Sequence, residues 1–146
     1  MKVLILGFSS IAQRKVIPAL EKLKLVSEIE VASKSKKVTL RGKLTKKYTS
    51  YKEAIIHSNA EIVYISLPNS LHYKYSEMCL LNSKNVIVDK PSILNRDELE
   101  KLMLIVKEKK LTINESTVYF YHKAVKKFIN INNQEKGILI ATFTVP

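Results

Sequence analysis

The chain has 146 residues, enough for one domain that buries about 70% of the surface exposed by its unfolded form. Its composition, 46% hydrophobic and 26% charged, is typical of a globular protein and excludes a disordered one. No apolar run approaches the roughly 20 residues that cross a bilayer, and the first run is too short for a secretory signal. We therefore expect a cytoplasmic protein with no membrane partner.

The formal net charge of +12 raises the question of a nucleic-acid partner. Lysine supplies 22 of the 25 basic residues, whereas proteins that read bases or fork onto phosphates favour arginine. We therefore expect a lysine-rich solvated surface and regard a nucleic-acid partner as the weaker alternative. The dense basic cluster at 33–47 is the segment that would carry it.

The single cysteine, Cys79, has no partner for an internal disulfide. It stands in an apolar segment with helical spacing, and no histidine or second cysteine lies at a metal-ligand spacing from it. We expect a buried, inert thiol and no metal site.

Apolar runs alternate with helical patterns along the chain. In order, the sequence predicts a strand at 2–7, a helix at 11–23, a strand at 27–33, a helix at 50–58, a strand at 60–68, a helix at 70–83, a strand at 84–91, a helix at 95–110, a strand at 111–116, a helix at 121–136 and a β-prone segment at 137–145. Ser50 and Asn95 are the expected N-caps. The alternation favours an α/β fold with a doubly wound parallel sheet, which is Rossmann-like.

The turn after the first strand has part of a phosphate-binding fingerprint. Gly7 permits a tight bend, and Ala12 is small enough for close packing of helix on strand, but Ser9 stands where the fingerprint has its second glycine. By itself, this turn fits a substituted nucleotide loop or an ordinary structural corner equally well.

Ligands of doubly wound sheets bind beyond the carboxyl ends of the strands. After the second strand, Ser33 and Lys34 stand where an acidic residue would hold the ribose 2′-hydroxyl of NAD. A serine and lysines accept a 2′-phosphate more readily, so NADP is favoured over NAD. The alternative is that Lys34 belongs to the general lysine surface.

Four motifs stand in the order and at the spacing of one known family: GFSSIAQRKVIPAL, EIVYISLPNSLHY, NVIVDKPSI and ESTVYFYHKAVKKF. Over nearly its whole length the chain resembles the family of glucose-fructose oxidoreductase, inositol dehydrogenase and the rhizopine-catabolism protein. In that family one strand ends in Pro-Asn, followed by a histidine, and the next ends in Glu-Lys-Pro. Here these motifs fall on Pro68, Asn69 and His72 and on Asp89-Lys90-Pro91.

The resemblance implies an NAD(P)-dependent oxidoreductase that transfers a hydride between a nicotinamide cofactor and a hydroxyl of a sugar, cyclitol or nucleotide sugar. It implies a dinucleotide-binding Rossmann domain at 1–120. Residues 121–146 would be a connecting helix and the first strand of a truncated or absent α+β substrate domain. Because that domain supplies a catalytic histidine in the family, a non-catalytic dinucleotide-binding module is the alternative. An unpaired strand at 137–145 could pair with a second copy of the chain, so a homo-oligomer is a further expectation.

The resemblance assigns Lys90 as the catalytic group beside the nicotinamide. The expected cofactor-binding residues are Gly7, Phe8, Ser9, Ser10, Ile11, Ala12, Ser33, Lys34, Leu67, Pro68, Asn69, His72, Asp89, Lys90 and Glu115. Three of these have a plain structural alternative: Lys90 as a solvated lysine, His72 as a residue with a local hydrogen bond, and Glu115 as a surface acid. The chain departs from the family at Asp89, where glutamate is usual, and at Phe120 and Lys123, where arginine and proline are usual.

Overall fold

The computed structural model describes residues 1–34 and 38–134. It divides into two compact units, one formed by Met1–Ser116 and a second that begins at Thr117. This boundary precedes the expected one at 120. The β-prone segment at 137–145 lies outside the described residues.

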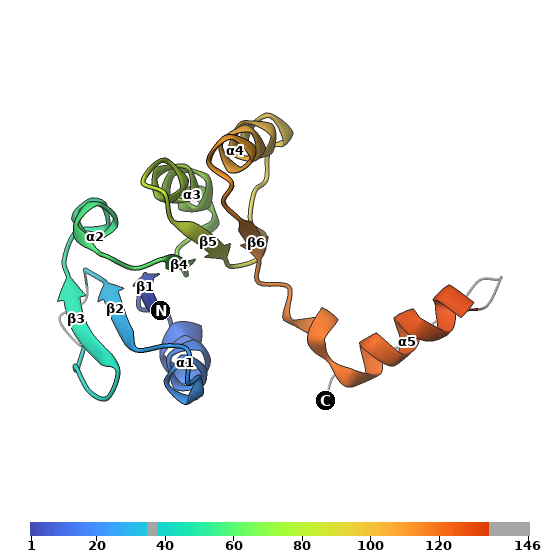
Figure 1. Cartoon of the computed structure of the whole chain (residues 1–146), viewed down its shortest axis with the longest axis horizontal. Helices are drawn as coiled ribbons and strands as arrows, with labels where there is room; N and C mark the ends of the chain where they lie inside the picture. The colour runs from blue at the N-terminus through green and yellow to red at the C-terminus, as the bar shows by residue number, and fades with distance from the viewer. Residues whose placement is uncertain (35–37, 135–146) are drawn as a thin grey trace. The chain divides into compact units, whose positions relative to one another are not determined.

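Six parallel strands form one sheet in the order β3-β2-β1-β4-β5-β6 (Figure 1). The strands are β1 (Lys2–Leu6), β2 (Glu28–Ala32), β3 (Leu44–Tyr48), β4 (Ile62–Ile65), β5 (Asn85–Val88) and β6 (Ile113–Glu115). The order reverses between β1 and β4, which is the switch point where doubly wound sheets bind ligands. The predicted doubly wound, Rossmann-like sheet is confirmed.

Helices cover both faces of the sheet (Figure 1). They are η1 (Ala12–Val16), α1 (Ile17–Lys22), α2 (Tyr51–His57), η2 (Asn69–Leu71), α3 (His72–Leu81) and α4 (Arg96–Lys109) in the first unit, and η3 (Val118–Tyr121) and α5 (Lys123–Gln134) in the second. Along β1, Leu4 and Leu6 pack with α2, α3 and α4, while Val3 and Ile5 pack with η1 and α1. This alternation produces one core on each face.

The predicted N-caps are confirmed. Asn95 Oδ1 accepts hydrogen bonds from the backbone N–H groups of Asp97 at 2.8 Å and Glu98 at 3.4 Å. Ser50 Oγ accepts from the N–H of Glu53 at 3.3 Å.

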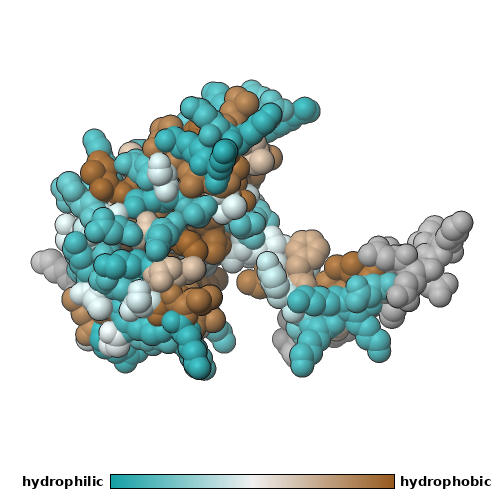
Figure 2. Space-filling view, viewed as in Figure 1, coloured by the Kyte–Doolittle hydropathy of each residue, from teal (hydrophilic) through white to brown (hydrophobic). Residues whose placement is uncertain are grey.

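Figure 2 shows hydrophilic surface over most of α4, in keeping with Leu102 as its buried residue. Within 1–34 and 38–134, no helix is both long and apolar enough to cross a membrane.

Strand β3 was not predicted. Its sequence, LTKKY, has one buried residue, Leu44, because β3 lies at the edge of the sheet. An edge strand pairs on one side only and tolerates lysines, so its pattern is weakly apolar. In the described part of the connection from β2 to β3 there is no helix; instead Gly42 turns the chain with φ +55°.

The first helix begins with the π-helical turn η1, in which the N–H of Ile17 donates to the carbonyl of Ala12. Pro18 follows directly and explains this turn. Proline has no N–H to donate, and its ring crowds the carbonyl four residues earlier, that of Arg14. The turn widens there, and a regular helix continues to Lys22.

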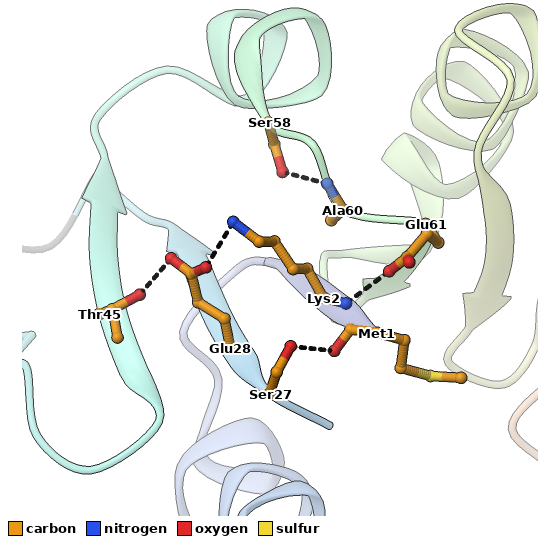
Figure 3. A network of polar contacts seen from close by, with 8 residues as sticks. All are labelled: Met1, Lys2, Ser27, Glu28, Thr45, Ser58, Ala60 and Glu61. Atoms are coloured by element: carbon orange, nitrogen blue, oxygen red, sulfur yellow. Dashed lines mark hydrogen bonds and ion pairs between the residues drawn. The ribbon is translucent and has the colours of Figure 1, made fainter. Parts of the chain in front are cut away.

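The amino ends of the strands are joined by polar contacts (Figure 3). Lys2 Nζ lies 2.6 Å from a carboxylate oxygen of Glu28, and Thr45 Oγ1 donates to Glu28 at 2.6 Å. The backbone N–H of Lys2 donates to Glu61 at 2.5 Å. The hydrogen bond from Lys2 holds the pKa of the Glu28 carboxyl below its ordinary value. The hydrogen-bonding and charge requirements of these groups are therefore met by one another at the amino-terminal edge of the sheet.

Candidate functional site

Gly7 lets the loop after β1 pack directly against the end of β4. Its φ is +91°, and a Cβ at this position would lie 2.2 Å from the carbonyl oxygen of Ser66 and 2.8 Å from Cδ2 of Leu67. Its N–H donates to the carbonyl of Ala32 at 2.9 Å, at the end of β2. Glycine is therefore required for the close approach of three strand ends.

Ser9, which replaces the second glycine of the fingerprint, joins two strand ends through its hydroxyl. Ser9 Oγ accepts from the N–H of Ala12 at 3.1 Å and lies 2.6 Å from Ser66 Oγ. Ser66 Oγ donates to Asp89 Oδ2 at 2.8 Å. Because a hydroxyl has one proton, Ser9 must be the donor to Ser66. The hydrogen bonds thus run in one direction, from the loop after β1 to the carboxylate after β5.

Asp89 is held by hydroxyl groups on both of its oxygens. Ser66 donates to Oδ2, and the Tyr64 hydroxyl donates to Oδ1. Burial, together with the bond to this carboxylate, raises the pKa of Tyr64 far above its ordinary value. The aspartate that stands in place of the family's glutamate is therefore matched to partners from β4.

These strand ends line a hollow of about 430 Å³, the Asp89 hollow, formed by Ser9, Ser10, Ile11, Ser66, Leu67, Pro68 and Asp89. Lys90 follows Asp89 directly and is exposed, and the peptide bond between Lys90 and Pro91 is cis. Gly7 and Lys90 stand at the carboxyl ends of parallel strands and therefore at the same edge of the sheet.

His72 is buried, with 1% of its surface exposed. Its Nδ1 lies 2.9 Å from the carbonyl oxygen of Pro91, and its Nε2 lies 2.8 Å from that of Leu67. Both ring nitrogens are therefore directed at backbone between two loops. These contacts join the loop after β4 to the loop after β5, so they are not confined to the first turn of α3, and the cofactor-facing role of His72 stays a prediction.

The remaining predicted residues fall at the same edge with different surroundings. Glu115, at the end of β6, accepts from the N–H of Ser92 at 2.8 Å and so holds the loop after Pro91. Ser33 is buried, and its N–H donates to the carbonyl of Tyr48 at 2.9 Å. Lys34 and Asn69 are exposed, Phe8 is half-buried and Ala12 is fully buried.

Sequence reasoning missed Tyr64 and Ser66 as parts of the site. Tyr64 lies in β4 and Ser66 follows the strand directly, in a run that the sequence pattern predicts only as an apolar strand. The available signal was the pair of polar residues, Tyr64 and Ser66, at alternate positions of this run.

Among the described residues, no three histidine, cysteine, aspartate or glutamate side chains gather in a way that could hold a metal ion.

Comparison with known proteins agrees with this architecture. A family model described as "Oxidoreductase family, NAD-binding Rossmann fold" matches residues 1–116. A dTDP-3,4-didehydro-2,6-dideoxy-alpha-D-glucose 3-reductase of Actinomadura kijaniata is 26% identical over 100% of this chain and 46% of its own length. A D-xylose 1-dehydrogenase (NADP(+)) of Haloferax volcanii is 24% identical over 94% of this chain and 43% of its own. The chain thus spans about half the length of the curated relatives it matches.

Solved structures give the same result. The 3-ketoreductase KijD10 of Actinomadura kijaniata, in complex with NADP and TDP-benzene, matches with a TM-score of 0.82 and 25% identity. The match covers 92% of this chain and 42% of that one. A scyllo-inositol dehydrogenase of Lactobacillus casei matches with a TM-score of 0.80 at 15% identity, over 92% of this chain and 41% of its own, which shows a shared fold.

Proposed function

Since the chain belongs to the oxidoreductase family of glucose-fructose oxidoreductase, inositol dehydrogenase and the rhizopine-catabolism protein, we propose that it binds a nicotinamide dinucleotide for redox chemistry on a sugar-like substrate. The substrate class is a hydroxyl, or the corresponding carbonyl, of a sugar, cyclitol or nucleotide sugar. The Actinomadura and Haloferax relatives, which are named for such substrates, support this choice.

One observation carries the proposal: the Ser9–Ser66–Asp89 hydrogen bonds join the ends of β1, β4 and β5 around the Asp89 hollow, at the switch point of the sheet. The lining fits a dinucleotide. It offers hydroxyl groups and backbone, and its one carboxylate, Asp89, already accepts from two hydroxyl groups of the protein. These two hydroxyl donors fix the position of the carboxylate at the end of β5.

The residues that would hold the dinucleotide come from three strand ends: Ser9 and Ser10 after β1, Leu67 and Pro68 after β4, and Lys90 after β5. A bound nicotinamide supplies or accepts the hydride in this chemistry. The chain's own contribution is to position the cofactor and to provide a cation at the reacting oxygen.

Lys90 is the proposed catalytic residue. Its Nζ, which is free to rotate on an exposed side chain, would donate a hydrogen bond to the oxygen that changes between hydroxyl and carbonyl. As an ammonium it stabilises negative charge on that oxygen, and as an amine it accepts the proton of the hydroxyl. His72 and Glu115, which contact Pro91 and Ser92 in the loop after Lys90, are positioning residues in this proposal.

NADP is the preferred cofactor in this proposal. The relatives support it, because KijD10 was solved with NADP and the xylose dehydrogenase is named for NADP(+). Lys34, exposed after β2, stands where NAD-specific sheets place an acid.

Titration calorimetry with NADP⁺ and NAD⁺ tests the binding step. Ser10→Glu adds a carboxylate to the lining of the Asp89 hollow, and it should weaken dinucleotide binding about tenfold or more by repulsion of the phosphates. The matched control is Asn59→Glu, on an exposed loop before β4 at the opposite edge. If the natural chain binds neither dinucleotide, the proposal is wrong.

A second candidate function is dinucleotide binding without catalysis. The observation that favours it is that the matching family model describes an NAD-binding Rossmann fold over residues 1–116, and the Asp89 hollow is formed within these residues. An absorbance assay of NADPH with sugars, cyclitols and nucleotide sugars separates the two functions. Turnover that is lost in Lys90→Met supports the oxidoreductase, whereas binding without turnover supports the module.

A further inference from the structure

A separate hollow of about 290 Å³ lies between the first turns of α3 and α4, and we call it the α3–α4 hollow. These two helices pack side by side on one face of the sheet (Figure 1). One wall is formed by η2 and the start of α3, and the other by the loop after Pro91 and the first turn of α4. Among the described residues, none lines both this hollow and the Asp89 hollow.

The α3–α4 hollow adjoins the proposed dinucleotide site on both walls. Pro68, which lines the Asp89 hollow, is followed directly by Asn69, which lines the α3–α4 hollow. On the other wall, Ser92 lines the α3–α4 hollow just after the Lys90-Pro91 pair. The two hollows are therefore neighbours, separated by the loops that follow β4 and β5.

Hydrogen bonds hold these two loops in place. The buried ring of His72 lies between them, with Nε2 at 2.8 Å from the carbonyl oxygen of Leu67 and Nδ1 at 2.9 Å from that of Pro91. The N–H of Ser92 donates to the carboxylate of Glu115 at 2.8 Å. The walls of the hollow are therefore fixed by the fold itself, which lowers the ordering cost of binding a ligand.

The lining combines hydrogen-bonding groups of several kinds with an apolar patch. The charged groups among its described residues are Lys74 and Glu98, whose formal charges cancel. Asn69 adds an amide, which both donates and accepts, and Tyr73 and Ile93 add apolar surface. Because the charges balance, the hollow has no net attraction for an anion or a cation. Its lining suits a neutral ligand that donates and accepts hydrogen bonds and also has an apolar face.

We infer that the α3–α4 hollow binds one ring of a neutral sugar or cyclitol. Each hydroxyl of such a ring both donates and accepts a hydrogen bond, so it can pair with the Lys74 ammonium, the Glu98 carboxylate and the Asn69 amide. The C–H groups of the ring would pack on Tyr73 and Ile93. The volume is at the lower end of the range for small-molecule sites, which agrees with a single ring.

The role of this hollow in catalysis rests on the proposed function. A substrate whose reacting carbon lies at Lys90 would extend past the loop after β5, and a second ring or the far side of the same compound would enter the α3–α4 hollow. Asn69 and Glu98 would then be specificity-determining residues for the substrate, whereas the Asp89 hollow would hold the dinucleotide.

Amide-resolved NMR titration of the natural chain with myo-inositol and D-xylose tests this inference. Both sugars should shift the backbone resonances of Ser70, Tyr73 and Glu98, with a Kd of about 1–10 mM, and the shifts should persist at saturating NADP⁺. Glu98→Gln removes the charged acceptor and should weaken the sugars about tenfold. Glu100→Gln, the same substitution at an exposed position of α4 outside the hollow, is the matched control and should stay within about twofold.

A second variant fills the hollow without removing a charge. Ser70→Tyr places a ring at an exposed position of the wall and should abolish the sugar shifts. Calorimetry with NADP⁺ should give the same affinity within about twofold for this variant and for Glu98→Gln, since neither residue lines the Asp89 hollow.

The other outcomes separate this inference from the proposed function. If NADP⁺ binds but neither sugar shifts the resonances of the hollow, the inference is overturned and the dinucleotide site stands. If inorganic phosphate or glucose 6-phosphate shifts them and the neutral sugars do not, the hollow binds anions through Lys74 and the inference is wrong. If the sugars bind in the hollow and NADP⁺ does not bind the chain, the sugar site stands and the proposed function fails.

Discussion

Ser9 and Ser66, 57 positions apart in the sequence, share a hydrogen bond of 2.6 Å. It joins the loop after β1 to the end of β4. Ser66 in turn donates a hydrogen bond to Asp89, which follows β5. The serine that interrupts the glycine fingerprint therefore has a specific partner. In this chain the loop is held by side-chain hydroxyl groups where the fingerprint has a bare glycine.

Replacement of Ser66 should damage this edge of the sheet. Ser66→Ala removes the donor to Asp89 and the acceptor for Ser9, and it leaves partly buried polar atoms unpaired. The free energy of unfolding in urea should fall by about 1–3 kcal/mol. Ser70→Ala, at an exposed position in η2, should change it by less than about 0.5 kcal/mol. Equal effects of the two substitutions would show that the network contributes nothing to stability.

The two described glycines, Gly7 and Gly42, both have positive φ but should differ in their tolerance of a side chain. Gly7→Ala places a Cβ 2.2 Å from a backbone carbonyl oxygen, which cannot move without shifting β4, so we expect a loss of about 4 kcal/mol or more. Gly42→Ala meets the flexible end of Glu21 at 2.7 Å, so the loss should be about 1–2 kcal/mol. Urea unfolding of both variants measures the difference. A Gly7 variant as stable as the Gly42 variant would contradict the close approach.

Cys79 should not react in the folded protein. Its side chain is fully buried, and burial raises the pKa of the thiol to about 12. Ellman's reagent at pH 8 should therefore modify it only as fast as the chain unfolds, and urea should accelerate the reaction in parallel with the unfolding transition. Rapid stoichiometric labelling in native buffer would show that the thiol is accessible.

Lys84 should make stability depend on alkaline pH. Its Nζ donates to the carbonyls of Ser58 at 2.7 Å and Ala60 at 3.1 Å, and burial lowers its pKa below the ordinary 10.5. The folded state therefore releases this proton at lower pH than the unfolded state does. As pH rises toward 10.5, the cost of burying the charge disappears, so the natural chain should gain stability relative to Lys84→Met.

Urea unfolding at pH 8 and pH 10 measures this trend. Lys52→Met, which removes a charge from an exposed position of α2, is the matched control. The stability difference between the natural chain and Lys84→Met should widen in favour of the natural chain, and that of the control should stay constant. A difference for Lys84→Met that narrows with pH would reverse the assigned direction of the pKa shift.

The sequence by itself determined most of the first unit. Apolar periodicity is a local property, and it located β1, β2, β4, β5, β6 and the main helices. The caps at Ser50 and Asn95 were readable because each cap side chain and the backbone N–H that donates to it lie within three residues. The motifs around Gly7, Pro68 and Lys90 identified the family because their order and spacing are written along the chain.

Only the tertiary structure decided how the site is held. Strand β3 has no pattern of its own, because at the edge of the sheet the backbone pairing to β2 defines it and one buried leucine suffices. The burial of His72 between two carbonyls and the Ser9–Ser66–Asp89 hydrogen bonds join residues from separate elements. Such contacts depend on how strands and helices pack in three dimensions. Local residue patterns do not show which distant residues this packing brings together.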